Sequence, residues 1–238
     1  MIKNSREILP FLFILLFLGS CTDFFSTSWA SWAARDPSKL IPDVTVGNVN
    51  ELIEKAENDP ALSLEVLKKI AKAVNNSSGK NKAVLQAAAV EAAVNAVGLG
   101  QTMLSVSGEL YNIINDEDAA TAATKKAIKN MPNLEETSST LYNTLPKNPA
   151  SKEFDNFVNT ASAEDIAMAA IVLYAGAARE HPAGIDDYVD NFDSDPDTNP
   201  SDEATLALHL ADALEHRQDE LPESLRSILN GLNLWKNT

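Results

Sequence analysis

Apolar residues recur at intervals of three and four along most of the chain from about Val49 onward. Spacing of this kind places apolar side chains on one side of an α-helix and polar side chains on the other. Runs that alternate Val, Ile, Thr and aromatic residues between hairpin turns are missing, so we expect no strands. The clearest amphipathic segment is Leu62–Val74, in which Val66, Leu67, Ile70, Ala71 and Val74 oppose Glu65, Lys68, Lys69 and Lys72.

Prolines separate the periodic segments. A proline is tolerated where a helix begins, because the N–H it lacks has no partner there. The pattern therefore predicts an all-α fold of roughly nine helices in antiparallel pairs joined by short turns. No fixed repeat period is found, so an irregular bundle and a short α-solenoid-like stack both remain open. The prolines that precede new helical segments are Pro60, Pro132, Pro149, Pro182, Pro200 and Pro222.

Two of the expected helices, Ala83–Val97 and Ile166–Ala178, are rich in alanine and carry little charge. A helix that is apolar on all sides has neighbours on all sides, and small side chains let helix axes approach closely. We therefore expect these two helices to form the centre of the domain. A transmembrane interpretation of Ala83–Val97 is the alternative, although Gln86 and Asn95 are unfavourable in hydrocarbon.

The N-terminus has the organisation of an export signal. Lys3 and Arg6 precede the apolar run Ile8–Leu18, and Leu18-Gly19-Ser20-Cys21 follows as a small-residue junction. The apolar run is too short to span a bilayer unaided. With a cysteine at the junction, this leader resembles that of bacterial lipoproteins. The alternative is an ordinary secretory signal in which the cysteine is present by chance.

The resemblance implies that Cys21 receives a diacylglyceryl group and that signal peptidase II cuts just before it. Residues 1–20 would then be the signal peptide, residues 21–43 the lipidated cysteine with a tether, and residues 44–238 a single all-helical domain. Two or three acyl chains hold a protein stably at a bilayer. Thr22 follows the cysteine where inner-membrane lipoproteins of enteric bacteria have aspartate, which favours the outer membrane, on its periplasmic side or at the surface.

The chain is strongly acidic, with a formal net charge of −15 that becomes −16 once residues 1–20, with two basic and one acidic residue, are removed. Such a chain is not expected to bind nucleic acid or anionic lipid by electrostatics. Cys21 is its one cysteine, so a disulfide within the chain is excluded. Between Glu180 and Glu215 the chain has acidic residues but neither Lys nor Arg, and an electrostatic function would belong to this segment.

The acidic loop that starts at Asp190 contains candidate calcium ligands. Hard cations take oxygen ligands at alternating positions. The spacing does not complete an EF-hand, because Thr198 stands where that loop needs glycine. The alternative is a polar loop that ends in Ser201 as a helix N-cap. The weak calcium candidates are Asp193, Asp195 and Asp197.

Candidate catalytic and zinc-binding residues are few. His209, Asp212 and His216 share one face of an expected helix and could supply zinc ligands, but the HExxH pattern is missing. A solvated histidine face is the alternative. A Gly-x-Ser-x-Gly elbow, a phosphate-binding loop and a complete dinucleotide-binding motif are also missing. We therefore expect a protein that is not an enzyme and that needs no cofactor.

The resulting hypothesis is a lipid-anchored, non-enzymatic helical interaction or scaffold module of the cell envelope, held to the membrane by the lipid on Cys21 and engaging another envelope protein. A binding protein for a small apolar ligand or solute, which could be accessory to a transporter, is the first alternative. Its basis is a cavity that the two alanine-rich helices could line. A hydrolase acting on an envelope polymer is the second.

Overall fold

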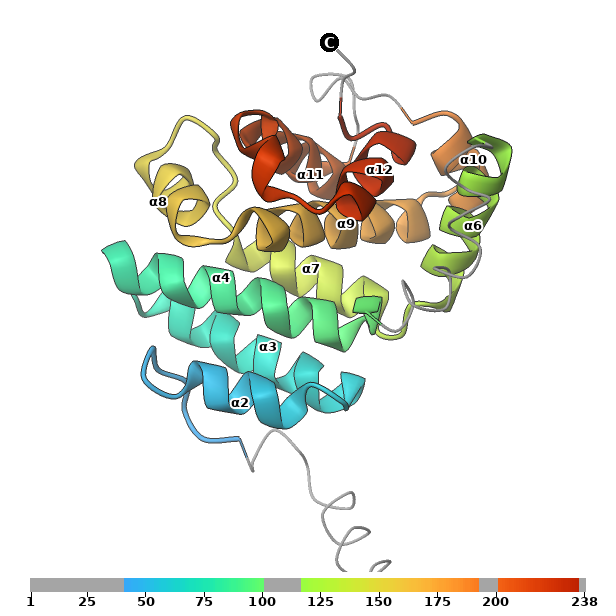
Figure 1. Cartoon of the computed structure of the whole chain (residues 1–238). Coiled ribbons are helices and arrows are strands. Elements are labelled where there is room, and N and C mark those ends of the chain that lie inside the picture. The colour runs from blue at the N-terminus through green and yellow to red at the C-terminus, as the bar shows by residue number, and fades with distance from the viewer. Residues whose placement is uncertain (1–40, 101–116, 193–200, 236–238) are drawn as a thin grey trace, which may run out of the picture. The chain divides into compact units, whose positions relative to one another are not determined.

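Helix α9 (Ala163–Glu180) lies at the centre of the domain in the computed structural model, which describes residues 41–100, 117–192 and 201–235. Its start is fixed by a capping box: Ser162 Oγ accepts from the Asp165 N–H at 3.0 Å, and Asp165 accepts from the Ser162 N–H at 3.2 Å. From Ile166 to Ala178 every residue except Met168 is buried. Helices α4, α7 and α11 surround it (Figure 1).

The predicted all-α fold is confirmed. The described residues form ten α-helices and one 3₁₀ helix, without a strand, all within the unit that spans residues 43–238. Besides α9, the elements are α2 (Val49–Ala56), α3 (Pro60–Asn75), α4 (Gly79–Ala96), α6 (Glu117–Asn130), α7 (Leu134–Thr144), α8 (Lys152–Thr160), α10 (Ile185–Asp190), α11 (Asp202–Ala213), η2 (Glu215–Glu220) and α12 (Glu223–Gly231).

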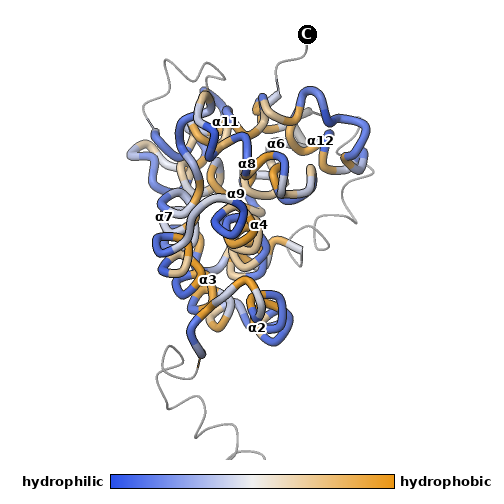
Figure 2. Tube along the Cα trace, turned by 90° about the vertical axis from the view of Figure 1, so that its left-hand side faces the viewer, coloured by the Kyte–Doolittle hydropathy of each residue, from blue (hydrophilic) through white to orange (hydrophobic). Residues whose placement is uncertain are grey.

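These helices pack as an irregular bundle with a recognisable order. Helices α2, α3 and α4 form one side, α7 and α9 follow, and α11 and α12 lie on the far side of α9 (Figure 1). Helix α8 covers one end of α4, and α6 packs against α10 at the opposite end of the domain. The hydropathy view shows polar residues outermost on α2 and α3 and apolar residues turned toward their neighbours (Figure 2).

The two alanine-rich segments behave as the sequence predicts. Ala83–Val97 corresponds to α4 and Ile166–Ala178 to α9, and the two helices contact each other. Most side chains of α4 are buried, because α2, α3, α7, α8 and α9 all pack against it. Helix α4 begins four residues before the predicted segment and ends one residue short of it, whereas α9 extends a few residues beyond the predicted segment at both ends.

Helices α7 and α9 approach each other closely at Gly176. A Cβ atom built on Gly176 would overlap both Cβ and Oγ of Ser138. Both residues are buried, so the absence of a side chain at Gly176 sets the distance between these helices. The sequence predicted this role of small residues for the pair α4 and α9, whereas the contact at Gly176 joins α9 to α7.

Helix starts follow the expected use of proline. Pro60 is the first residue of α3, and Asp59 Oδ1 accepts from the N–H groups of Ala61 and Leu62 at 3.0 and 3.1 Å. The other prolines within the described ranges stand shortly before their helices and outside them. Of the prolines that the sequence placed before helices, these are Pro132, Pro149, Pro182 and Pro222; Pro200 lies outside the described residues.

Asn133 connects three helix ends. Its side-chain Nδ2 donates to the carbonyl oxygen of Pro60 at 3.3 Å and to that of Ala96 at 3.2 Å. Its backbone has φ of 52°, in the left-handed region that Asn tolerates better than most residues. The start of α3, the end of α4 and the start of α7 are thereby held together.

Gln86 is the most deeply buried polar side chain of α4. Its Nε2 donates to the carbonyl oxygen of Thr144 at 3.1 Å and to Glu153 Oε1 at 2.9 Å. Glu153 also accepts from Lys82 Nζ at 2.9 Å. These hydrogen bonds lower the pKa of Glu153, that from Lys82 most, against the opposing effect of burial. Helix α8 is therefore attached to α4 by polar contacts as well as by packing.

Within the described ranges, no single helix combines the length and the apolar composition needed to cross a membrane. Helices α8 and α9 meet these criteria only when they are taken together, and a 116° bend separates them. The transmembrane interpretation of Ala83–Val97 requires an apolar segment that continues toward Glu109. Residues 101–116 lie outside the described part of the chain, so this interpretation stays an alternative.

Candidate binding groove

Several residues singled out in the sequence lie outside the described part of the chain. They include Cys21 with the whole leader and most of the tether, and the calcium candidates Asp193, Asp195 and Asp197. Their roles stay predictions. The neighbouring helix start is described: Ser201 Oγ accepts from the Ala204 N–H at 3.3 Å, which confirms Ser201 as the N-cap of α11.

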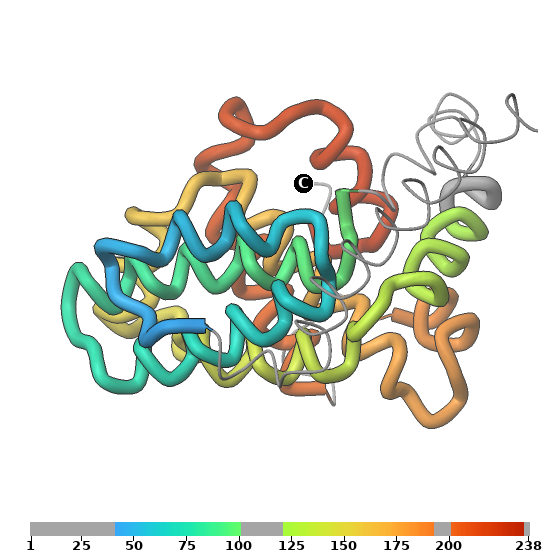
Figure 3. The backbone as a smooth tube through the Cα atoms, turned by 90° about the horizontal axis from the view of Figure 1, so that it is seen from below, coloured from blue at the N-terminus to red at the C-terminus, as the bar shows by residue number. Residues whose placement is uncertain are grey.

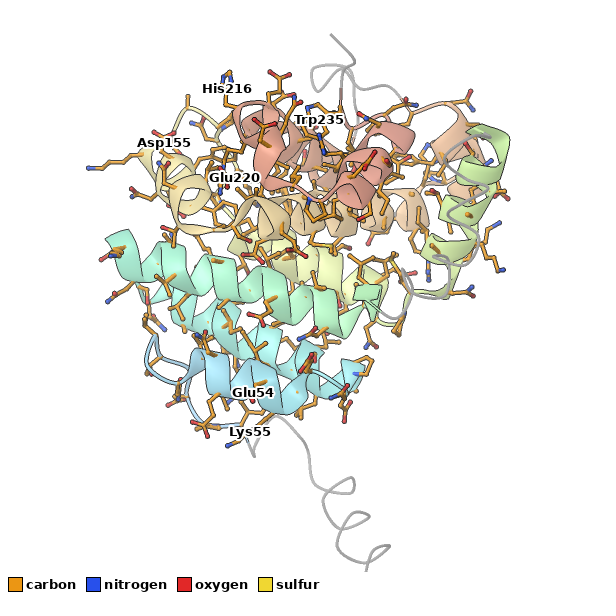
Figure 4. All side chains as sticks on the ribbon, in the orientation of Figure 1. Glu54, Lys55, Asp155, His216, Glu220 and Trp235 are labelled. Carbon is orange, nitrogen blue, oxygen red and sulfur yellow. The ribbon has the colours of Figure 1, made fainter. Side chains whose placement is uncertain are left out.

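The prediction that His209, Asp212 and His216 share one helical face was wrong for its last member. Helix α11 ends at Ala213, and His216 belongs to the 3₁₀ helix η2, whose tighter winding changes the direction of its side chains. His209 is half-buried, whereas His216 projects from the edge of the domain (Figure 4). Among the described residues, no group of three or more His, Cys, Asp or Glu side chains is arranged to hold a metal ion.

Part of the acidic segment between Glu180 and Glu215 forms ion pairs with another helix. Lys125 Nζ lies 2.6 Å from Asp190 Oδ1, and Lys129 Nζ lies 2.9 Å from Asp186 Oδ1. The two lysines belong to α6 and the two aspartates to α10. Charge pairing between α6 and α10 thus accounts for two of the carboxylates that the sequence left without an explanation.

A groove of about 710 Å³ lies where the loop before α2 meets the end of α3 and the start of α4. Figure 3 shows this loop beside the turn between α3 and α4. A volume of this size is within the range of ligand sites in proteins. Its lining comes from three separate parts of the chain: Asp43, Val44, Thr45, Val46 and Gly47, then Lys69, Lys72, Ala73, Asn76 and Ser77, and finally Asn81 and Leu85.

One wall of the groove is a loop closed by Asn48. The side-chain Oδ1 of Asn48 accepts from the Thr45 N–H at 2.8 Å, and its Nδ2 donates to the Asp43 carbonyl at 3.0 Å. Asn48 occupies the N-cap position of α2 without capping that helix with its side chain. Its hydrogen bonds instead hold the loop in one conformation, so this wall is already in place before any ligand arrives.

Val46 stands at the rim of this wall. Val46 is 40% exposed, more than any other large hydrophobic residue in the described part of the chain. By contrast, Val44 and Leu85, which also line the groove, are 8% and 1% exposed. The groove therefore has an apolar floor and an apolar point on its edge.

The opposite wall carries positive charge. Lys69 and Lys72 line the groove, and neither makes an ion pair within the described residues. Lys68, beside them on α3, is paired with Glu65 at 2.8 Å and with Glu136 at 2.7 Å. Asp43 is the one acidic residue of the lining. In a chain of net charge −15, the groove is thus a local site of positive charge.

Asn76 and Asn81 supply neutral hydrogen-bonding groups. Asn76 Nδ2 donates to the Lys72 carbonyl at 3.0 Å, which leaves its Oδ1 as an acceptor. The Asn81 amide makes no hydrogen bond within the described residues. Anionic groups, peptide groups and apolar side chains could therefore all find complementary partners in this groove.

Comparison of the chain with protein-family models, with curated proteins and with solved structures found no match.

The sequence did not indicate this groove. Its residues carry no motif, and they come together only when the loop before α2 reaches the turn between α3 and α4. In the sequence, Lys69 and Lys72 are simply part of the polar face of a helix. Their presence close together in so acidic a chain was the one available signal.

Proposed function

We propose that this protein is a lipid-anchored, non-enzymatic interaction module of the bacterial cell envelope that engages a partner protein at the groove formed by the loop before α2, the end of α3 and the start of α4. The lipoprotein-like leader supports the location, with Cys21 as the lipidated residue and the outer membrane as the favoured site. The groove supports the interaction, because it combines a preformed wall, an exposed valine and two lysines without ion partners within the described residues.

Exposed Val46 is the observation that carries this proposal. A large apolar side chain on a loop held by hydrogen bonds loses its exposure to water when a partner covers it, and this burial stabilises the complex. The charged and amide groups around it would form the polar rim that such interfaces have.

Photo-crosslinking in intact cells tests the proposal. A photoreactive amino acid is placed at Val46 in the full chain, and a second chain carries it at Ser227, which is exposed on α12. We expect a discrete crosslinked species, identifiable as an envelope protein by mass spectrometry, from position 46 and none from position 227. Identical products from both positions, or none from either, would contradict the proposal.

A small-ligand function is the second candidate, and the groove volume of about 710 Å³ with its buried floor favours it. The groove does not lie between the two alanine-rich helices, where the sequence suggests such a cavity, since only α4 contributes to it. Native mass spectrometry of the full chain in detergent distinguishes the two functions. A retained small molecule would support this second candidate, whereas a clean apo mass would count against it.

A further inference from the structure

We infer that the groove binds an extended acidic segment of the partner protein, one that places carboxylates against Lys69 and Lys72 and an apolar side chain against Val46. This inference rests on the proposed interaction function and specifies the chemistry of the partner.

Charge is the first reason. The chain as a whole has a net charge of −15, so an anionic segment is repelled by the molecule overall and attracted where lysines lack acidic partners. Within the described residues, Lys68, Lys82, Lys125 and Lys129 have carboxylate partners from this chain, but Lys69 and Lys72 have none. Among the residues that the structure describes, no carboxylate occupies their ammonium groups, which can therefore pair with carboxylates of a partner.

The form of the groove favours a peptide over a compact solute. Small-molecule sites enclose most of the ligand surface, whereas this groove is open to solvent and has its exposed apolar residue on the rim. An extended segment would pass along it, with alternate side chains turned toward and away from the floor. The Asn76 Oδ1 and the Asn81 amide are suited to peptide N–H and C=O groups of such a segment.

The start of α4 adds to the attraction. Ser78 is the N-cap of this 18-residue helix but accepts no hydrogen bond from it with its side chain. The first N–H groups of the helix are therefore without an intrahelical or side-chain acceptor, and they carry the positive end of the helix dipole. Asn81, in this first turn, lines the groove.

Selection from a library of short random peptides displayed on phage tests the inference, with the full chain in detergent as the target. We expect enriched peptides to contain clustered Asp or Glu with an adjacent apolar residue. The best peptide, made synthetically with a fluorophore, should lose affinity about tenfold for the double variant Lys69→Glu/Lys72→Glu, and binding should weaken as salt is raised.

A matched pair of single variants controls for net charge. Lys72→Glu and Lys126→Glu change the net charge equally, but Lys126 is exposed on α6, at the end of the domain opposite α8 and the groove (Figure 1). Only Lys72→Glu should weaken binding. Equal effects of the two variants, enrichment without acidic residues, or full competition by a free small carboxylate such as citrate would overturn the inference.

Failure of the inference can be separated from failure of the proposed function. If position 46 crosslinks to an envelope protein but acidic peptides do not bind, an interaction module remains and only the chemistry of its partner was wrong. If the chain binds vesicles containing anionic lipid at the groove and binds no peptide, a membrane surface replaces the peptide and the inference is overturned.

Discussion

Gly176 of α9 and Ser138 of α7 occupy complementary positions, so that any side chain on the first would overlap the second. Gly176→Ala should destabilise the domain by about 1–3 kcal/mol, because the added methyl group forces two packed helices apart at a buried contact. Urea unfolding followed by circular dichroism measures the change. Gly231→Ala, at a position with no atom near the added Cβ, should change stability by less than about 0.5 kcal/mol.

The reciprocal change separates overlap from other effects of the substitution. Ser138→Gly removes the atoms that the new methyl group would meet, so Gly176→Ala should cost less in that background than in the natural chain. Additive effects of the two substitutions would show that the close contact is not the cause.

Two substitutions of Asn133 should lower the stability of the domain by different amounts. Asn133→Ala loses two hydrogen bonds and places alanine at a φ of 52°, and we expect a loss of about 2–3 kcal/mol. Asn133→Gly loses the same hydrogen bonds without backbone strain, so its loss should be smaller, at about 1 kcal/mol. Thermal or urea unfolding gives both values. An alanine variant no less stable than the glycine variant would argue against the left-handed conformation.

Glu153 predicts a pH dependence of stability. Because its pKa in the folded chain lies below its usual value of 4.5, the stabilisation from Lys82 and Gln86 is complete above that pH and is lost as the pH falls through the folded value. The stability difference between the natural chain and Glu153→Gln should therefore shrink as the pH falls below 4.5. In a Lys82→Met background, the same comparison should depend less on pH. A difference that stays constant with pH would contradict this account.

Cys21→Ser tests the anchor. If the lipid on Cys21 is the attachment to the membrane, the variant should lose incorporation of labelled palmitate and should move from the membrane fraction to the released fraction. Thr22→Ser, one residue further, should leave both unchanged. Retention of Cys21→Ser in membranes after salt washing would reopen the transmembrane interpretation of Ala83–Val97.

The helical part of the fold was largely predictable because local pattern and tertiary packing agree. Leu62–Val74 forms most of α3, and its apolar face is the buried one. Ser201 is the N-cap of α11, as expected. High alanine content together with little charge identifies α4 and α9 as central helices, since only helices enclosed by others can dispense with charged faces.

The groove and the ion pairs could not be predicted, because they depend on residues far apart in the chain. The pairing of Lys129 with Asp186 requires knowledge that α6 lies beside α10. The role of Val46 depends on Asn48, whose side chain closes the loop in place of capping α2. A cap residue in the sequence predicts a helix start, but it does not say where its side-chain hydrogen bonds go.

The enclosure of α9 has a consequence for how relatives of this chain could be recognised. Its neighbours leave no room for a side chain at Gly176, and the alanines of this helix are buried, whereas helices with an open face can change freely. Distant homologues should then share a run of alanine and glycine around Gly176 and diverge in α2 and α12. In a chain without a reactive motif, this steric constraint should be the most conserved sequence feature. The small buried residues that it concerns are Ala167, Ala169, Ala170, Ala175, Gly176, Ala177 and Ala178.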